Sequence, residues 1–408
     1  MKKKRIVILL GAGATVPWGG KTSDKLTKTV LDPEENETNI LSNTEKIPLG
    51  KFLQRKIEEF YKLNEESHSN EADDAKEVIN FEHVLEIIEY LFSYYRNKNF
   101  SNHIWARPSF PSVFKVENEI DNEIPEEEIE IWDIENDKNQ KKSVTLYKLY
   151  QEILWRLCEQ IRDYSESFGK TDYEKKDHKF CEFINTLSER NILRVYSLNY
   201  DNLILQQKGI QDSFFNGFES ENKYRYNYSR IIQNADENCF YNLHGSFYFK
   251  DDHINHYAAS EIVFEPNTPT VIRPEHNVEL LGTPIIRSQI ITGSQKLLKT
   301  LVQPISAFNY IFRNDCYNAN EIMVIGYSFT DVHINNILAS ALDSNTNNKF
   351  NIITLIDNPN SFRDFQNQLI RSFKNHEKEI NTIIFMEEQD WLYSENNTFS
   401  IYTKGFLS

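Results

Sequence analysis

The sequence predicts an α/β fold in which helices flank a parallel sheet and a largely helical insertion follows the first strand. Two patterns lead to this prediction. Short apolar, β-branched segments recur along the chain and end in glycine or polar residues, and segments with helical spacing lie between them. Hydrophobic residues make up 39% of the 408 residues and charged residues 26%, which provides a sizeable core and excludes a wholly disordered chain.

Five segments are predicted to be buried strands. The first covers residues 5–10, is apolar without interruption and ends directly in Gly11. The other four cover residues 192–198, 239–243, 321–325 and 351–356. Helical spacing is found at residues 77–95, 145–164 and 175–190, and a further helix is expected after Asp331. Because strands alternate with helices, the sheet is expected to be parallel and Rossmann-like.

These elements suggest three parts of the chain. Residues 1–30 and 190–360 are expected to form the Rossmann-like core, which binds the ligand. Residues 31–189 are expected to be a mostly helical insertion with an exposed acidic stretch near 117–142. Residues 361–408 are expected to be a C-terminal α/β extension that packs on the core.

Composition excludes several classes of function. The formal net charge is −16, so no direct sequence-specific binding of nucleic acid is expected. No apolar run approaches the roughly 18 residues of a transmembrane helix, so no membrane partner is expected. The early IVILL run is too short for a signal peptide and ends in a glycine turn. The four cysteines, Cys158, Cys181, Cys239 and Cys316, form no CxxC pair, which disfavours a zinc ribbon and predicts reduced thiols in a cytoplasmic protein.

A turn with two glycines, GAGAT at residues 11–15, follows the first strand directly. Glycines let a backbone approach a pyrophosphate, and a following helix would present its N-terminal N–H groups to that ligand. Val16 stands where the GxGxxG fingerprint has its last glycine, so a tight turn without a ligand explains the pattern as well. Trp18, in the PWGG segment that follows, is either a flap over a nucleotide or a packing residue.

Two further strand ends carry side chains suited to catalysis. Asn199 and Asp201 follow the second strand, where they can hold a water, a ribose hydroxyl or an amide, or can cap the next helix. His244 follows the third strand beside Gly245, and an imidazole that titrates near neutrality can act as a general base.

The last two strand ends suit ligand binding. Gly326 allows close approach and Ser328 can donate a hydrogen bond to phosphate or ribose, while Asp331 is expected to cap the next helix. Asp357 suits the hydroxyls of an adenosine ribose. Ligands of open α/β sheets bind at the carboxyl ends of the strands, so the ordered set at five strand ends predicts a ligand site there.

In this order the motifs resemble those of the sirtuin-like NAD-binding domain. Sirtuins carry a GAGxS turn, a TQNID strand end, a catalytic His followed by Gly, a GTSL strand end and a final ribose-binding strand end. The counterparts here are GAGAT, SLNYD at 197–201, HG at 244–245, GYSF at 326–329 and Asp357. The chain departs from sirtuin deacylases, because it lacks their Cys₄ zinc ribbon, has PWGGK in place of GIPDFR and has Leu198 in place of the Gln of TQNID.

The segments NYD, LHGS and GYSFTD are more similar to bacterial sirtuin-like effectors of anti-phage defence, which hydrolyse NAD. The size and the GAGATVPWGG start look most like the sirtuin-like subunit that assembles with a HerA-type hexameric ATPase. The resemblance therefore implies a NAD glycohydrolase that uses NAD as its substrate, needs no metal, and works as a homo-oligomer with a possible HerA-type partner.

The resemblance also assigns roles to the motif residues. Asn199 would position the attacking water and the ribose, His244 would act as the base, and Asp201 would hold the nicotinamide carboxamide. The remaining binding residues would be Gly11, Ala12, Gly13 and Thr15 at the pyrophosphate, Trp18 over the nucleotide, and Gly326, Ser328 and Asp357 at the adenosine side. Two alternatives stay open: a NAD-dependent protein deacylase, disfavoured by the missing zinc module, and a non-catalytic sensor of NAD or ADP-ribose that gates a partner.

Overall fold

The computed structural model describes most of the chain except several internal stretches. The described residues are 3–31, 80–97, 138–167, 174–207, 210, 213–219, 225–234, 236–252, 261–264, 269–271, 275–280, 283–292, 296–345, 349–386 and 388–406. The chain divides into two compact units. The sheet unit comprises Met1–Thr22, Ile161–Thr270 and Thr300–Ser408, and the helical unit comprises Ser23–Gln160 and Val271–Lys299.

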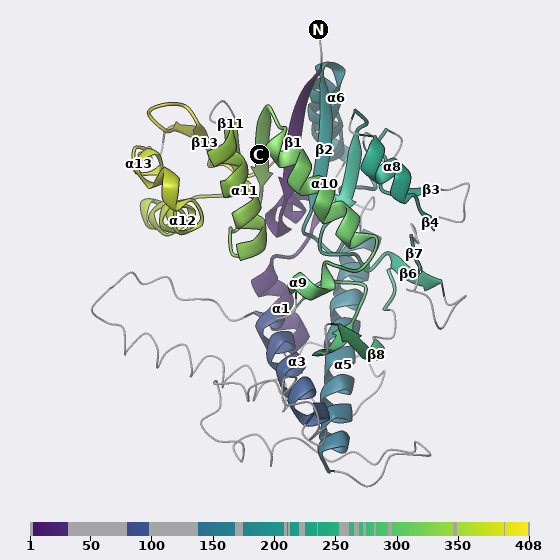
Figure 1. Ribbon diagram of the computed structural model, residues 1–408. Helices are drawn as coiled ribbons and strands as arrows, with labels where there is room; N and C mark the ends of the chain where they lie inside the picture. Colours follow the sequence, from purple (N-terminus) through teal and green to yellow (C-terminus); the bar gives the residue numbers. More distant parts are fainter. Residues whose placement is uncertain are drawn as a thin grey trace. The chain divides into compact units, whose positions relative to one another are not determined.

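Seven strands among the described residues form the main sheet of the sheet unit (Figure 1). Their order is β12-β13-β11-β10-β1-β2-β5, and every neighbouring pair is parallel except β12 with β13. The strands are β1 (Lys4–Leu10), β2 (Asn191–Ser197), β5 (Cys239–Asn242), β10 (Glu321–Ile325), β11 (Lys349–Ile353), β12 (Trp391–Tyr393) and β13 (Phe399–Tyr402). The predicted parallel α/β fold is confirmed.

The strand order places β1 inside the sheet, between β10 and β2. The chain passes from β1 to β2 and β5 on one side, then crosses to β10, β11 and β13 on the other. This is the strand order of dinucleotide-binding folds, in which the crevice for the ligand lies where the order reverses. Leu10 pairs with both Ser197 and Ile325, so the carboxyl ends of β1, β2 and β10 are level with one another.

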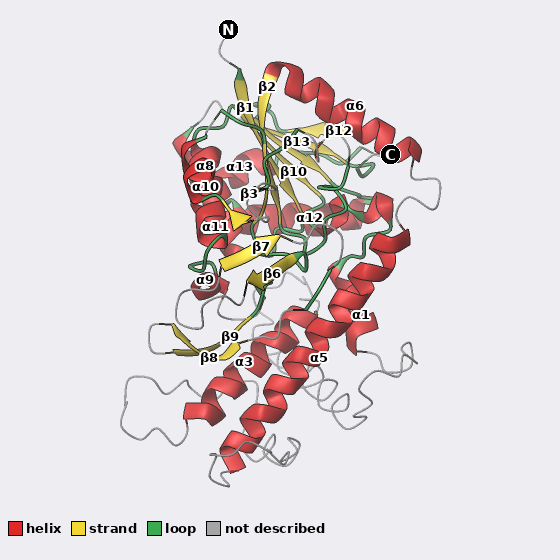
Figure 2. Cartoon of the chain, turned by 90° about the vertical axis from the view of Figure 1, so that its right-hand side faces the viewer, coloured by secondary structure: helices red, strands yellow, loops and turns green. Residues whose placement is uncertain are grey.

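Helices cover both faces of this sheet. Figure 2 shows α6 (Glu174–Arg190) on one side, and α8 (Tyr228–Gln233), α10 (Ile305–Tyr317) and α11 (Val332–Ser344) on the other. The C-terminal segment adds α12 (Pro359–Ser372), η4 (Lys374–His376), α13 (Glu377–Ile380) and the strands β12 and β13. The segment expected to pack on the core therefore contributes two strands to the sheet itself.

The sheet unit also contains a small antiparallel sheet in the order β3-β4-β7-β6. Its strands are β3 (Phe218–Glu219), β4 (Arg225–Tyr226), β6 (Phe249–Asp252) and β7 (Glu261–Phe264).

Two cysteines of the sheet unit are buried. Burial raises the pKa of the Cys239 thiol to about 12 and that of the Cys316 thiol well above its ordinary value, so both thiols are poor nucleophiles.

In its described residues, the helical unit consists of helices and one hairpin. Its elements are α1 (Ser23–Leu31), α3 (Phe81–Asn97), the first part of α5 (Lys138–Ser167), the hairpin of β8 (Glu275–Leu280) and β9 (Thr283–Arg287), and α9 (Lys296–Lys299). Inside it, the ammonium group of Lys299 contacts the carboxylate of Glu89, the hydroxyl of Tyr150 and the backbone oxygen of Thr292. Such a buried ion pair holds together elements that are distant in sequence.

The predicted insertion is observed only in part. Residues 117–137 of the acidic stretch lie outside the described residues, whereas Lys142, at the other end of that stretch, is buried in α5 and not exposed. Residues 271–299, which the sequence boundaries place in the core, belong to the helical unit. No helix in the described part of the chain has both the length and the apolar character needed to cross a bilayer.

Candidate active site

The turn after β1 packs directly against the end of β10. Gly11 and Gly13 donate their N–H groups to the backbone oxygens of Ile325 and Gly326, both at 2.9 Å. A Cβ on Gly13 would lie 2.8 Å from the Gly326 Cα, and one on Gly326, whose φ is +63°, would lie 2.2 Å from the Ala14 nitrogen. Glycine is therefore required here for the close approach of two backbones.

The helix expected directly after this turn is absent. Two short 3₁₀ helices follow instead, η1 (Ala12–Ala14) and η2 (Val16–Trp18), and α1 begins only at Ser23. The N–H groups of Ala14 and Thr15 donate to the backbone oxygens of Gly11 and Ala12. The prediction of a helix N-terminus that faces the pyrophosphate was wrong, because the 3₁₀ turns use these donors within the protein.

Trp18 is fully buried in the sheet unit. Its ring lies edge-on to Phe180 and Phe406, with centroid separations of 5.4 and 6.1 Å. These contacts favour the packing alternative over a flap that covers a nucleotide.

The end of β2 carries Asn199 and Asp201, and both are buried. The carboxylate of Asp201 accepts hydrogen bonds from the Tyr164 hydroxyl at 3.0 Å and the Leu203 N–H at 3.1 Å, and the Thr15 side chain also bonds to it. Burial raises the pKa of Asp201 to about 6 despite these bonds. Asp201 thus connects the first motif, through Thr15, to the second.

Asn199 differs from Asp201 in what its side chain contacts. Its backbone N–H donates to the Ser197 hydroxyl at 3.1 Å, and its backbone oxygen accepts from the Asn242 amide at 3.4 Å. Its side-chain Nδ2 is buried and has no hydrogen-bond partner among the described residues. An unpaired buried amide costs about 1–3 kcal/mol, and a ligand that accepts a hydrogen bond would remove this cost.

His244 lies beside Asn199 because β2 and β5 are paired. Ser197 and Asn242, the last residues of these strands, are register partners, and Asn199 and His244 each stand two residues further on. The loops stay together beyond the strands, since the Ser246 hydroxyl donates to the Tyr200 backbone oxygen at 3.0 Å. Asn199 and His244 therefore occupy equivalent positions on neighbouring strand ends.

The loop after β10 is held by side chains of α11 and α12. Phe329 has a positive φ of 59°, which a bulky residue adopts rarely, and its backbone oxygen accepts from the amides of Asn335 at 2.7 Å and Gln368 at 2.6 Å. The Tyr327 hydroxyl donates to Asn335 Oδ1 at 2.9 Å. The loop is therefore rigid, and it presents Ser328 on the surface, where its hydroxyl contacts that of Thr330 at 3.1 Å.

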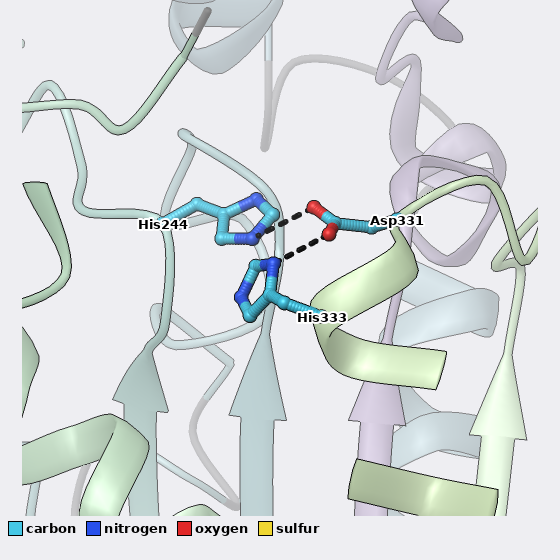
Figure 3. Close-up of side chains that lie close together, drawn as sticks. All are labelled: His244, Asp331 and His333. Atoms are coloured by element: carbon cyan, nitrogen blue, oxygen red, sulfur yellow. Dashed lines mark ion pairs between the residues drawn. The ribbon is translucent and has the colours of Figure 1, made fainter. Parts of the chain in front are cut away.

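The start of α11 contributes two side chains near His244 (Figure 3). One carboxylate oxygen of Asp331 lies 3.3 Å from His244 Nε2, and the other lies 2.5 Å from His333 Nδ1. The two rings are tilted by 35°, with centroids 5.5 Å apart. Asp331 does stand at the N-cap position of α11, but its side chain makes no capping hydrogen bond. The predicted N-cap position of Asp331 is confirmed, while its carboxylate faces the two imidazoles.

The structure brings together most of the predicted residues. Gly11, Gly13 and Gly326 are in contact across β1 and β10, Thr15 reaches Asp201, and Asn199 neighbours His244. Asp357 lies on the surface, past the end of β11, directly before Asn358, which caps α12. The carboxyl edge of the sheet therefore carries a glycine turn, an amide and an imidazole.

Residues 194–383 match the family model of the SIR2-like domain. This part of the chain is similar to a SIR2-like domain. The matched region begins within β2 and includes Asn199, Asp201, His244 and the loop after β10. The match supports a sirtuin-like family member, and SIR2-like domains are NAD-dependent enzymes. No curated protein matches the chain.

Sequence reasoning missed three contacts of the candidate site. Tyr164 and Thr15 both contact Asp201, although long stretches of chain separate them from it. The pairing of Asp331 with His244 and His333 was also missed. Its signal was the spacing Asp-x-His at a helix start, because a residue at the N-cap and one two positions later lie close together.

Proposed function

We propose that this chain is a NAD glycohydrolase, which cleaves NAD to nicotinamide and ADP-ribose. The observation that carries the proposal is the buried side-chain amide of Asn199, which has no hydrogen-bond partner among the described residues and stands at the strand-end position equivalent to that of His244. The reversal of strand order beside it and the SIR2-like domain support a dinucleotide as the ligand.

The proposed reaction breaks the bond between the nicotinamide nitrogen and C1′ of the ribose. The bonding electrons leave with nicotinamide, which departs as a neutral molecule, and the oxygen of a water forms the new bond to C1′. Asn199 holds this water and the ribose, and His244 accepts the proton that the water loses. In this proposal the carboxyl edge of the sheet supplies both the positioning group, Asn199, and the base, His244.

The other motif residues bind the substrate in this proposal. Gly11, Ala12, Gly13 and Thr15 line the pyrophosphate, which the two glycines let approach the backbone, and Gly326, Ser328 and Asp357 hold the adenosine side. Asp201 takes the carboxamide of nicotinamide, which then joins the bonds that the carboxylate accepts from Tyr164 and Leu203.

We extend the proposal to the biological role on the motif resemblance alone. The chain would act in the cytoplasm as a toxic effector of anti-phage defence that depletes NAD, assembled as a homo-oligomer and paired with a HerA-type hexameric ATPase. Assembly would hold the loops at the site in an inactive arrangement until infection.

The test is a product analysis with purified protein. We expect incubation with NAD to release free nicotinamide and ADP-ribose in equal amounts, measured by chromatography, with and without a HerA-type ATPase. Release of O-acetyl-ADP-ribose only when an acetylated peptide is present would show a deacylase instead. Tight binding of NAD with no products under either condition would show a non-catalytic sensor.

A further inference from the structure

His244, Asp331 and His333 form a compact cluster of metal-ligand side chains (Figure 3). Each offers one ligand atom, and these three atoms lie within 4.8 Å of one another. The cluster joins the loop after β5 to the start of α11, and its side chains are 5%, 9% and 14% exposed, in order of residue number. It is partly sheltered from solvent and combines nitrogen and oxygen donors.

The distances in the cluster suit a small metal ion. Two ligand atoms bound to zinc at about 2.1 Å with tetrahedral angles stand about 3.4 Å apart. His244 Nε2 and Asp331 Oδ2 are 3.3 Å apart. His333 Nδ1 and Asp331 Oδ1 are 2.5 Å apart, which is closer than two ligand atoms of one ion, so a bound cation would move these two atoms apart.

The backbone around Asp331 holds its carboxylate in this place. Asp331 donates its N–H to the Tyr327 hydroxyl at 3.0 Å, and that tyrosine is bonded to Asn335. A side-chain cap from Asp331 to α11 would contribute about 1 kcal/mol, yet the carboxylate faces the two imidazoles instead. The protein therefore forgoes helix stabilisation to keep the three donors together.

The donor set indicates the class of ion. Two imidazoles and one carboxylate suit divalent transition metals such as zinc, while magnesium and calcium prefer sites made of oxygen atoms only. Three protein ligands leave one position of a tetrahedral ion open for water.

We propose that His244, Asp331 and His333 bind a divalent transition-metal ion of the zinc class, and that the bound ion keeps His244 from serving as a base. The second part rests on the proposed function, whereas the binding of the ion does not. The ion is an inhibitor in this proposal and not a reagent, because it occupies the nitrogen of His244 that faces Asp331.

The first experiment measures binding without any enzymatic readout. Full-length, tag-free protein is stripped with a chelator and dialysed against Zn²⁺, and bound metal is counted by mass spectrometry. We expect the wild type to bind one ion more than either His333→Ala or Asp331→Asn, and Co²⁺ to give the absorption of a four- or five-coordinate site only in the wild type. His376→Ala is the matched control, since His376 also contacts two carboxylates, those of Asp343 and Glu379.

Circular dichroism is used to check that each variant is folded. If His333→Ala does not fold, Asp331→Asn still tests the site, because asparagine is also a preferred N-cap residue. Equal zinc counts in the wild type and both variants, or no bound ion in the wild type, would overturn the site.

The second experiment adds NAD to the same samples. We expect Zn²⁺ to lower the turnover of the wild type at least tenfold and a chelator to restore it. Turnover that zinc leaves unchanged while the cluster holds the ion would overturn the inhibitory role. Ion binding without any turnover in the metal-free wild type would support the site and count against the NAD glycohydrolase instead, so the two failures are distinguishable.

Discussion

The middle of β2 and the residues just past its carboxyl end treat buried polar groups in opposite ways. At the middle of the strand, Arg194 is 1% exposed and its guanidinium donates to the Asp315 carboxylate at 2.6 Å and to the Glu237 backbone oxygen at 2.7 Å. Past its carboxyl end, Asn199 is also buried, but its side-chain amide nitrogen has no partner among the described residues. The buried charge of Arg194 is paired within the protein, whereas the Asn199 amide is a donor that a ligand can use.

This contrast separates stability from function within one strand. A buried ion pair holds elements together, and removing one partner leaves an uncompensated charge. A buried amide without a partner costs stability and is retained where a ligand supplies the missing bond. We therefore expect substitutions of the Arg194–Asp315 pair to affect unfolding, and substitutions beyond the end of β2 to affect turnover.

The largest effect is expected at the carboxyl end. Asn199→Ala and His244→Ala should each lower the rate of nicotinamide release from NAD about a thousandfold, because the water loses its positioning group or its base. Thermal unfolding followed by circular dichroism should stay cooperative in both variants.

His178→Ala, which alters an exposed histidine of α6, is the control for this measurement and should keep wild-type turnover. Wild-type rates in both Asn199→Ala and His244→Ala would refute the assignment of the site.

The next effect is expected at the buried ion pair of Arg194 and Asp315. Asp315→Ala should lower the free energy of unfolding by about 3 to 5 kcal/mol, because it leaves the guanidinium of Arg194 buried without its carboxylate. Urea unfolding measures this change. Asp343→Ala removes a half-exposed carboxylate beside His376 and should cost less than 1 kcal/mol. Similar losses of unfolding free energy in the two variants would show that the buried Arg194–Asp315 pair stabilises the protein no more than an exposed pair does.

A smaller effect is expected where the loop after β10 contacts the turn after β1. Gly326→Ala should destabilise the protein by about 2 to 4 kcal/mol, because a Cβ there meets the Ala14 backbone nitrogen at 2.2 Å. Gly405 has a similar positive φ of 83°, but a Cβ on it would find its nearest neighbour at 3.6 Å. Gly405→Ala should therefore cost only about 1 kcal/mol, and an equal loss in both variants would mean that backbone strain, not the close approach, explains the glycine.

The last effect concerns the pH dependence of stability. Burial raises the pKa of Asp201 to about 6 from an ordinary value of 3.8, so the folded state holds this proton more tightly than the unfolded state does. Its contribution to stability is present below pH 3.8 and is lost as the pH rises through 6, by on the order of 3 kcal/mol.

Urea unfolding between pH 4 and pH 7 tests this dependence. The stability of Asp201→Asn relative to the wild type should increase with pH over this window. Asp357→Asn, at an exposed position, should show no such trend. A constant difference between wild type and Asp201→Asn would contradict the raised pKa.

The strands were predictable because their signal is local. The run at residues 6–10 is apolar without interruption, and a strand covered on both faces requires that pattern. The end of β11 was placed too late, at Ile356 instead of Ile353, because apolar residues continue past the end of the strand. The charged Arg194 within an otherwise apolar strand gave no local sign of its partner, since Asp315 comes from a helix far along the chain.

The site was predictable only in outline. Parallel strands align their carboxyl ends, so motifs that follow successive strands had to share one edge of the sheet. The partners of each side chain depended on packing that the sequence does not display. Asp331 illustrates this, because its residue type and position predict a helix cap, while the nearby imidazoles of His244 and His333 engage its carboxylate instead.

The most direct test of the central claim is a crystal structure of the His244→Ala variant with NAD bound. We predict the pyrophosphate at the turn of residues 11–15, and the nicotinamide ribose within hydrogen-bond reach of the Asn199 side chain. NAD bound away from the carboxyl ends of β1, β2 and β5, with the Asn199 amide still unpaired, would contradict the account.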